Sequence, residues 1–286
     1  MTRLKKGVTG VGVDLHAGGV TGTHALLHVY DTQLRGESEF ASADRVDRDG
    51  PVLVGRYREG RGFVVHEAGW RASTGEVARV ARRVLAPLLD DPAVTDVEWK
   101  TRGHDTVQAA LDDALLDLGL VPGEVESVMI GRASDLAGDT PLPEGVRIRR
   151  ITAESDVRAM SAMADEAFGD PRSERTADAL MRRLADECGD PEGMSLWIAD
   201  ADGEIVSCGR LEPVRGTDVA GLWGGATRAD RRRGGVYRAL TAARARHALT
   251  LGRTLLHSDC SADSRPILAR SGLTKVTTTT PYVWRR

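Results

Sequence analysis

The stretch that decides the fold is residues 222–251, LWGGATRADRRRGGVYRALTAARARHALTL. Its opening residues are apolar or small, which predicts a buried strand. A charged turn and two glycines, Gly234 and Gly235, come next. The Ala-, Arg- and Leu-rich segment that continues to Leu251 predicts a helix. The stretch therefore predicts a strand, a glycine loop and a helix in succession.

The loop between this strand and this helix has the features of an anion site. The first turn of a helix presents N–H groups without intrahelical partners, together with the positive end of the helix dipole. Glycine lets the main chain approach a ligand without a Cβ atom in the way. Five arginines lie between Arg228 and Arg238, opposed there by Asp230, in a chain whose net charge is −3. We interpret the loop as a cradle for a pyrophosphate.

Residues 232–237, RRGGVY, resemble the Arg/Gln-x-x-Gly-x-Gly/Ala acetyl-CoA loop of the GNAT superfamily of N-acetyltransferases. Gly235 stands at the first glycine of that pattern. Tyr237 stands where the family usually has a small residue, and we expect it to crowd the last turn of the loop. Downstream, a strand at 254–259 and a helix at 263–271 resemble the elements that close this fold. The resemblance covers residues 147–286 well and the first half only partly.

The resemblance implies a fold, a cofactor and a reaction. The fold is α/β (α+β), with a mixed, splayed central sheet flanked by helices, in two tandem copies. The cofactor is acetyl-CoA, and an amine attacks its thioester directly, without a covalent enzyme intermediate. Holding the pyrophosphate falls to the main chain of Arg232, Arg233, Gly234, Gly235, Val236 and Tyr237. Polarising the thioester carbonyl falls to the main chain where the central strand splays, at Gly225, Ala226 and Thr227.

A β-bulge at Gly224 and Gly225 would permit this splay, because a bulge disrupts the ladder locally. Donors preorganised toward a developing oxyanion stabilise it by roughly several kcal/mol. Proton transfer is the remaining task. The family often places a tyrosine acid in the closing helix, where this chain has Leu268. Tyr282 on the last strand is the alternative donor, unless it is a packing aromatic beside Trp284.

Two carboxylates are candidates for the base. Glu212 lies at the end of the strand before the central one, and Asp259 lies at the end of the strand after it. For both, an exposed surface carboxylate is the alternative interpretation. His257 shares a strand face with Asp259 and is equally compatible with a half-buried packing role. We predict that Cys260 is inert, because nothing in the sequence lowers its pKa.

The order of elements repeats along the chain. Helix 76–90, strand 96–100, helix 106–118 and strand 126–130 match helix 235–251, strand 254–259, helix 263–271 and strand 275–284. We therefore predict a degenerate copy at residues 1–135, a linker at 136–146 and the acetyl-CoA-binding domain at 147–286. The first copy lacks the arginine cluster and the paired glycines, so we expect it to bind no cofactor and to shape the acceptor site. An unrelated α/β packing module is the alternative.

The composition of the chain argues against several other classes of protein. Hydrophobic residues make up 41% and charged residues 28%, as in an ordinary globular protein. No apolar run approaches the roughly 20 residues needed to cross a bilayer, so we expect no membrane partner. Three widely spaced cysteines, Cys188, Cys208 and Cys260, indicate a reducing cytoplasm and no metal cluster. Acidic residues outnumber basic ones in the first half, which argues against nucleic-acid binding.

One histidine pair could suggest a metal. His24 and His28 lie four apart on a predicted helix from Thr23 to Leu34, which would place both on one face. They have no neighbouring glutamate and no third ligand, so we predict packing or surface roles and no metal. A homodimer is compatible with the sequence.

The leading function hypothesis is acetyl transfer from acetyl-CoA to a primary amine of a small molecule. Relatives of this family with a degenerate first copy include enzymes that inactivate amine-bearing antibiotics, such as aminoglycoside-like sugars. An acidic first half would attract such a cationic acceptor. Two alternatives stay open. One is acetylation of a protein terminus or lysine, and the other is a non-catalytic module that senses acyl-CoA.

Overall fold

The computed structural model describes residues 20–58 and 60–286. Its strands form one 12-stranded mixed sheet in the order β1-β2-β3-β4-β12-β6-β11-β10-β9-β8-β7, with the short β5 paired to β12. The strands are β1 (Arg45–Asp49), β2 (Val52–Tyr57), β3 (Arg61–His66), β4 (Asp96–Arg102), β5 (Val121–Pro122), β6 (Glu126–Arg132), β7 (Val146–Ile151), β8 (Ser195–Ala201), β9 (Glu204–Pro213), β10 (Val219–Thr227), β11 (Leu255–Cys260) and β12 (Thr274–Arg285).

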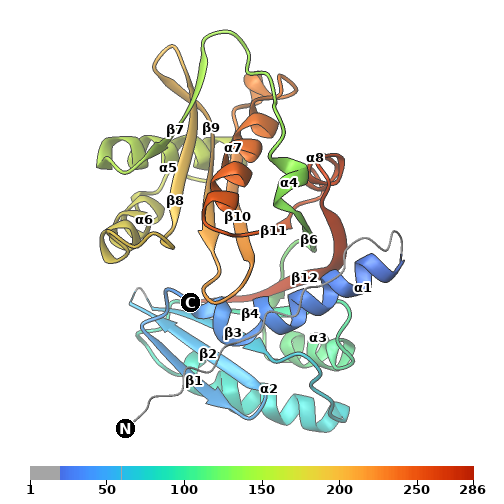
Figure 1. Cartoon of the computed structure of the whole chain (residues 1–286). Helices are drawn as coiled ribbons and strands as arrows, with labels where there is room; N and C mark the ends of the chain where they lie inside the picture. The colour runs from blue at the N-terminus through green and yellow to red at the C-terminus, as the bar shows by residue number, and fades with distance from the viewer. Residues whose placement is uncertain (1–19, 59) are drawn as a thin grey trace, which may run out of the picture.

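Helices cover both faces of this sheet (Figure 1). They are α1 (Val20–Val29), α2 (Thr74–Leu89), α3 (Gln108–Asp117), α4 (Ala133–Leu136), α5 (Glu154–Phe168), α6 (Glu174–Asp186), α7 (Val236–Thr250) and α8 (Arg265–Arg270). Three short helical segments join them, a π-helix η1 (Tyr30–Leu34) and the 3₁₀ helices η2 (Gly36–Phe40) and η3 (Ala229–Arg231). The predicted fold class, a mixed and splayed sheet flanked by helices, is confirmed.

In the C-terminal half, two apolar layers lie on opposite faces of the sheet. The α7 face is packed by alternate strand residues such as Leu222 and Leu256, together with Ala245 and Leu268 of the helices. The α5 and α6 face is packed by Val157, Met160, Leu180 and their neighbours against Ile198 and Ala226. Successive strand residues point to opposite faces, so this alternation fixes which side chains of β10 and β11 face which layer.

The N-terminal half has a core of its own. Helices α2 and α3 pack their apolar stripes on β3 and β4, where Trp99 is fully buried. Strands β3 and β4 are parallel and joined through α2, just as β10 and β11 are parallel and joined through α7. The predicted repeat of helix, strand, helix and strand is therefore present in both halves.

The last strands of the two halves are exchanged. Strand β6, from the first half, pairs antiparallel with β11 of the second, with Leu256 opposite Gly131. Strand β12, the last of the second half, pairs antiparallel with β4 of the first, with Tyr282 opposite Trp99. Figure 1 shows β12 running from α8 in the upper half down to β4 in the lower half. The predicted division of the chain at residues 136–146 therefore does not divide the sheet.

Helix α1 and η1 lie across this junction (Figure 1). Leu26, Val29 and Tyr30 pack with Val128 of β6 and Leu255 of β11 on the face opposite α7. The predicted helix at 23–34 is thus present, although its last turn is a π-helix. The polar segment that follows, residues 35–48, contains η2 and the start of β1.

Two local sequence signals, one for a hairpin turn and one for a helix end, coincide with elements of the structure. The β8–β9 hairpin turns at Asp202 and Gly203, both with positive φ, as an Asp-Gly turn requires. Helix α2 runs through Pro87 to Leu89 with Asp90 as its C-cap, which agrees with the predicted end of this helix at residue 90. Among the described residues, no helix has both the length and the apolar character to cross a bilayer.

Candidate functional site

The central sheet opens between β10 and β11. The two strands pair in parallel only from Val219 with Leu255 to Gly221 with His257. Strand β10 continues to Thr227 along β9 without further pairing to β11. The opening therefore exposes one edge of β10 at its carboxyl end, the side of a parallel αβ unit where ligands bind.

The predicted bulge is present in β10. Its register against β9 shifts between Trp223, opposite Arg210, and Ala226, opposite Cys208. Gly224 inside the bulge has φ +57°, a conformation that favours glycine. The bulge bends β10 at the start of the opening, directly before the residues predicted to hold the thioester carbonyl, Gly225, Ala226 and Thr227.

The loop before α7 is shaped to present main-chain N–H groups. Arg233 has φ +66° and Gly235, the N-cap of α7, has φ +81°. Within the described chain, the N–H groups of residues 233–237 make no hydrogen bond, whereas Ala239 begins the helical pattern by donating to Gly235. Alternating left- and right-handed residues create an anion-binding concavity. A strained non-glycine residue such as Arg233 is a frequent mark of a functional loop.

The arginines of the loop divide into two groups. Arg228 is paired with Glu204 and Asp230, and Arg232 donates to the carbonyl oxygens of Thr227 (3.2 Å) and Ala167 (3.1 Å). These two fix the loop to β9 and to the end of α5. Among the described residues no ion pair involves Arg233 or Arg238, which leaves both available to an anion. The side chain of Arg232 thus holds the loop in place, and its N–H donates to the carbonyl oxygen of Ala229 (3.4 Å), so the pyrophosphate role predicted for the main chain falls to the residues after it.

The side chain of Tyr237 reaches back to the bulge in β10. Its crowding of the last turn of the loop stays a prediction. A Cβ atom at Gly225 would lie 2.8 Å from its Cε2 and 3.0 Å from its hydroxyl oxygen. The ring therefore covers the position predicted to bind the thioester carbonyl. Behind it lies Arg244, fully buried, which donates to the carbonyl oxygen of Arg210 (3.1 Å) and to Thr241 Oγ1 (3.2 Å). Burial lowers the pKa of Arg244, and the nearby Tyr237 opposes that shift.

Glu212 is held by arginines. Its Oε2 lies 2.6 Å from Arg183 Nη1 of α6, and its Oε1 lies 3.1 Å from Arg210 Nε. Both of its carboxylate oxygens are thus engaged by guanidinium groups. The structure therefore places Glu212 near the opening without the free oxygen that a base requires.

Asp259 is also paired, but in a different arrangement. Its Oδ2 accepts from Lys100 Nζ of the first half (2.8 Å), and its Oδ1 lies 3.0 Å from His257 Nε2. The ion pair with Lys100 and the bond to His257 keep the pKa of Asp259 far below its usual value, although burial alone would raise it. The carboxylate thus stays charged and orients the imidazole. Sequence analysis did not predict Lys100, because its partner lies on a strand of the other half.

The position of Tyr282 favours the packing role that was the alternative to a proton donor. Its side chain is buried in the core of the first half, opposite Trp99 and away from the opening between β10 and β11. Burial raises its pKa to about 12, with Asp112 as the nearest charge. Leu268, at the family position of the tyrosine acid, is buried in the α7 layer. Burial also raises the pKa of the Cys260 thiol to about 11, so the predicted inertness of Cys260 is supported.

The corresponding opening in the first half is filled by side chains. Arg35, directly after η1, reaches the end of β3, where its two Nη atoms donate to both oxygens of Asp105 (2.9 and 2.7 Å) and to the carbonyl oxygen of His66 (3.2 Å). His66 Nε2 lies 2.7 Å from the same carboxylate. Burial lowers the pKa of His66 despite this partner.

The helix that follows β3 also differs from α7. Ser73 caps α2, and its N–H and its Oγ both donate to Glu76 Oε2, at 2.9 and 2.7 Å. This capping box engages the N–H of Ser73 and places a carboxylate at the mouth of α2, where a phosphate would be repelled. In both features the first half differs from the loop before α7, and the absence of a cofactor there stays a prediction.

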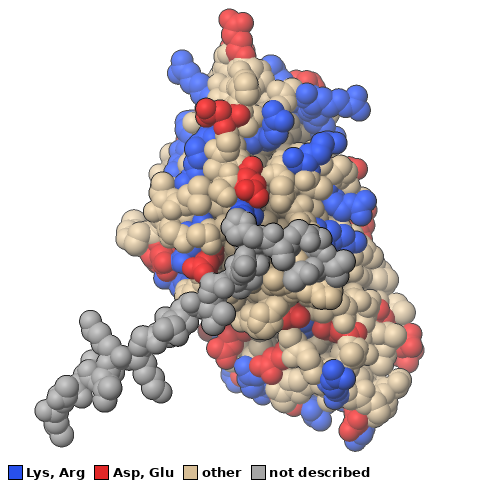
Figure 2. All heavy atoms as spheres, turned by 45° about the vertical axis from the view of Figure 1, so that its right-hand side comes forward, with Lys and Arg blue, Asp and Glu red and all other residues tan. Residues whose placement is uncertain are grey.

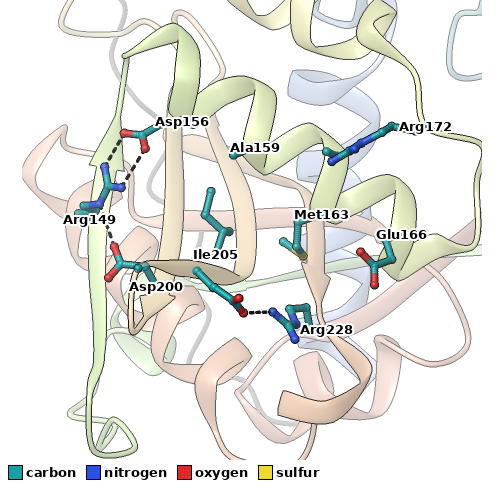
Figure 3. A pocket seen from close by; sticks show the side chains of 12 residues that line it. Arg149, Asp156, Ala159, Met163, Glu166, Arg172, Asp200, Ile205 and Arg228 are labelled. Carbon is teal, nitrogen blue, oxygen red and sulfur yellow. Dashed lines mark hydrogen bonds and ion pairs between the residues drawn. The ribbon is translucent and has the colours of Figure 1, made fainter.

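A shallow hollow of about 540 Å³ lies beside α5, outside the opening between β10 and β11 (Figure 3). Its charged groups are largely paired with one another, as Figure 3 shows for Arg149 with Asp156 and Asp200. Arg228, at the start of the loop, forms one wall through its ion pair with Glu204. We assign the hollow no chemistry, because it contains neither the bulge nor the free N–H groups.

Charge is distributed unevenly on the surface. On the face drawn in Figure 2, Lys and Arg side chains gather over the upper, C-terminal half, and acidic and basic side chains alternate over the lower half. This agrees with the acidic balance of the first half of the sequence. Within the described ranges, no group of three or more His, Cys, Asp or Glu side chains could hold a metal.

Comparison with known proteins agrees with this geometry. Residues 158–269 match the model of the Acetyltransferase (GNAT) family. No curated protein matches the sequence significantly. A GCN5-related N-acetyltransferase from Kribbella flavida is similar over 84% of this chain and 89% of its own, at 17% identity and a TM-score of 0.61.

Two further solved structures are similar over most of their length. A GCN5-related N-acetyltransferase from Sphaerobacter thermophilus matches over 82% of this chain and 76% of its own, at 18% identity and a TM-score of 0.61. A tandem GNAT protein from the clavulanic acid biosynthesis pathway, solved without AcCoA, matches over 86% and 85%, at 13% identity and a TM-score of 0.59. At these identities the likeness establishes the fold.

Proposed function

We propose, from the premise that residues 158–269 form an acetyltransferase domain of the GNAT family, that the protein transfers the acetyl group of acetyl-CoA directly to a primary amine of a small molecule. Acyl-CoA-dependent acetyl transfer is the chemistry of the family. One observation carries the proposal for this chain. The unbonded N–H groups of residues 233–237 lie at the mouth of α7, directly after the strand that leaves its parallel neighbour.

The donor side follows from this arrangement. The loop N–H groups and the dipole of α7 bind the diphosphate, with Arg233 and Arg238 as additional cations. The pantetheine arm extends into the opening along β10, where Tyr237 must leave Gly225 before the thioester carbonyl can reach the main chain. The chain's own donors at Gly225, Ala226 and Thr227 then stabilise the oxyanion that forms on attack.

The acceptor approaches the opposite face of the sheet. That face carries Trp223, His257 and the α5 and α6 helices, and α7 lies on the other side. An amine is the acceptor favoured by the acidic balance of the first half, since cationic molecules are concentrated near negative potential. Amine-bearing antibiotics of the aminoglycoside type are the class that we propose first.

Thiol release tests the reaction. Purified protein is incubated with acetyl-CoA and polyamines, aminoglycosides or lysine peptides, and free CoA is measured with a thiol reagent while calorimetry measures acetyl-CoA binding. Turnover with small amines supports the proposal. Turnover with peptides alone supports a protein acetyltransferase, and tight binding without turnover on any amine supports an acyl-CoA sensor. An absence of acetyl-CoA binding would overturn all three.

Removing the ring of Tyr237 is expected to tighten acetyl-CoA binding. In the Tyr237→Ala variant no ring has to leave Gly225, so the free energy of binding gains about 1 kcal/mol, the usual cost of reordering one side chain, or roughly fivefold in Kd. Calorimetry measures the change, with Tyr237→Phe as the control that keeps the ring. Weaker binding in the alanine variant would show instead that the ring contacts the cofactor.

A further inference from the structure

We infer that His257 is the general base that takes a proton from the acceptor amine, and that Asp259 and Lys100 of the first half are the positioning residues that orient it. The inference rests on the proposed acetyl transfer and adds to it the residue that performs the proton step. It gives the first half, through Lys100, a direct part in the active site.

The position of His257 fits this role. It is the last residue of β11 that pairs with β10, opposite Gly221, so it stands where the opening begins. Its neighbour Leu256 belongs to the α7 layer, and the side chain of His257 therefore points to the opposite face. Donor and acceptor can then meet across the opening, with the cofactor entering past α7 and the amine from the side of α1.

The imidazole is held from several sides. Its Nε2 lies 3.0 Å from Asp259 Oδ1, the ring of Trp223 packs edge to face at 5.2 Å, and the ring of Tyr30 lies at 5.8 Å. The side chains of His257 and Asp259 are 7% and 3% exposed. A neutral imidazole bound in this way donates through Nε2 and keeps a lone pair on Nδ1. Nδ1 makes no hydrogen bond within the described part of the chain.

The orientation depends on the first half of the protein. Lys100 Nζ donates to Asp259 Oδ2 at 2.8 Å, and both side chains are largely buried. Behind Lys100, Arg102 donates through Nη1 to the Lys100 carbonyl oxygen (2.8 Å) and through Nε to the hydroxyl of Tyr30 (3.3 Å), and it pairs with Glu39. A carboxylate that orients a histidine through one ring nitrogen is the arrangement that directs the other nitrogen to substrate.

The competing bases are occupied. Glu212 is bound to Arg183 and Arg210, and Asp259 is bound to Lys100 and His257. Trp223 and Tyr30 contact the imidazole but cannot accept a proton as neutral aromatic groups. His257, by contrast, offers an unengaged Nδ1 lone pair at the opening.

The proton step is balanced as follows. The acceptor ammonium gives one proton to Nδ1 of His257, and the neutral amine nitrogen attacks the thioester carbonyl carbon. The C–N bond forms and the C–S bond breaks, so that CoA leaves as a thiolate. The new amide nitrogen loses its second proton, and the thiolate takes up one. His257 releases its proton to water, so that one ammonium and one thioester yield an amide, a thiol and one proton.

The test uses the full chain and the amine that gives turnover. His257→Gln keeps a hydrogen-bonding side chain beside Asp259, and we expect kcat to fall by about 10²- to 10⁴-fold, the usual contribution of a general base. The Kd of acetyl-CoA should not change, because the donor binds past α7. His247→Gln is the matched control, since His247 on α7 packs against Trp197 of β8 and its replacement should leave kcat unchanged.

The positioning residues have a test of their own. The double variant Lys100→Met/Asp259→Asn removes both charges of the buried pair together and should remain folded. We expect kcat to fall at least tenfold with the Kd of acetyl-CoA unchanged, and the ring ¹⁵N signals of His257 to change as the bond from Nε2 to the carboxylate is lost. These signals, unlike kcat, report orientation directly.

The outcomes separate this inference from the proposed function. No turnover by the wild-type protein on any amine overturns the proposed function and this inference with it. If the wild-type protein acetylates an amine and the His257→Gln variant has the same kcat, this inference alone is overturned. Unchanged His257 signals in the double variant would overturn the roles of Asp259 and Lys100 and leave the base in place.

Discussion

Replacing Gly235 with glutamate is expected to abolish acetyl-CoA binding while the protein stays folded. A Cβ atom at Gly235 meets no other atom within 4 Å, so the new side chain has room. The residue has φ +81°, and a side chain there costs about 1–2 kcal/mol of stability. The carboxylate stands at the mouth of α7 against the diphosphate, and like charges in such contact cost several kcal/mol, or roughly 100-fold or more in Kd.

A matched control lies at the other end of the same helix. Gly252 has φ +72° and equally open surroundings, so Gly252→Glu imposes the same backbone strain without a charge at the loop. Calorimetry should show wild-type affinity for acetyl-CoA in this variant. Gly235→Ala separates strain from charge and should bind nearly as well as the wild type. Equal losses in the Gly235→Glu and Gly252→Glu variants would contradict the assignment of the loop.

Replacing Lys100 with methionine is expected to destabilise the protein strongly. The change leaves Asp259, 3% exposed, as a buried charge without its cation. Breaking a buried pair on one side costs about 3–5 kcal/mol of unfolding free energy, which urea unfolding would measure. Adding Asp259→Asn to the same chain should restore most of that loss. A single variant as stable as the wild type would show that the pair is not a stabilising contact.

The same pair predicts the direction of acid sensitivity. The pKa of Asp259 in the folded protein lies far below its ordinary value. Stabilisation by this group is therefore complete above about pH 4, near its unfolded pKa, and is lost progressively as the pH falls below that. In the Lys100→Met/Asp259→Asn variant this part of the acid dependence should disappear, which unfolding curves at pH 3 and pH 7 would reveal.

Much of the fold could be predicted from local sequence patterns. Helix α7, the hairpin at Asp202 and Gly203, and the repeat of helix and strand in both halves follow from periodicity and turn residues, which act within a few positions. The bulge at Gly224 and Gly225 was predicted for the same reason. The exchange of β6 and β12 could not be predicted, because the sequence pattern of each strand is the same whether it pairs within its own half or with the other half.

The residues of the candidate site also fall into those that local sequence patterns predict and those that they do not. The glycine loop is a local motif, and the geometry of Gly235 and the free N–H groups support its predicted place. The choice between proton donor and packing residue for Tyr282 could not be made from the sequence, because it depends on β12 running into the core of the first half. Asp259 was chosen from its position, but alternation alone could not show that it binds Lys100 and holds His257. Such a contact joins strands that lie far apart in the sequence, and only tertiary structure brings them together.

Because β6 and β12 are exchanged, each half completes its part of the sheet only by pairing with strands of the other half. A fragment containing only the GNAT-like part would leave the outer edge of β11 bare and β12 without β4, a pair of open strand edges of the kind that aggregates. Efforts to trim this protein to a minimal catalytic module should therefore fail, and both halves should unfold together in a single transition.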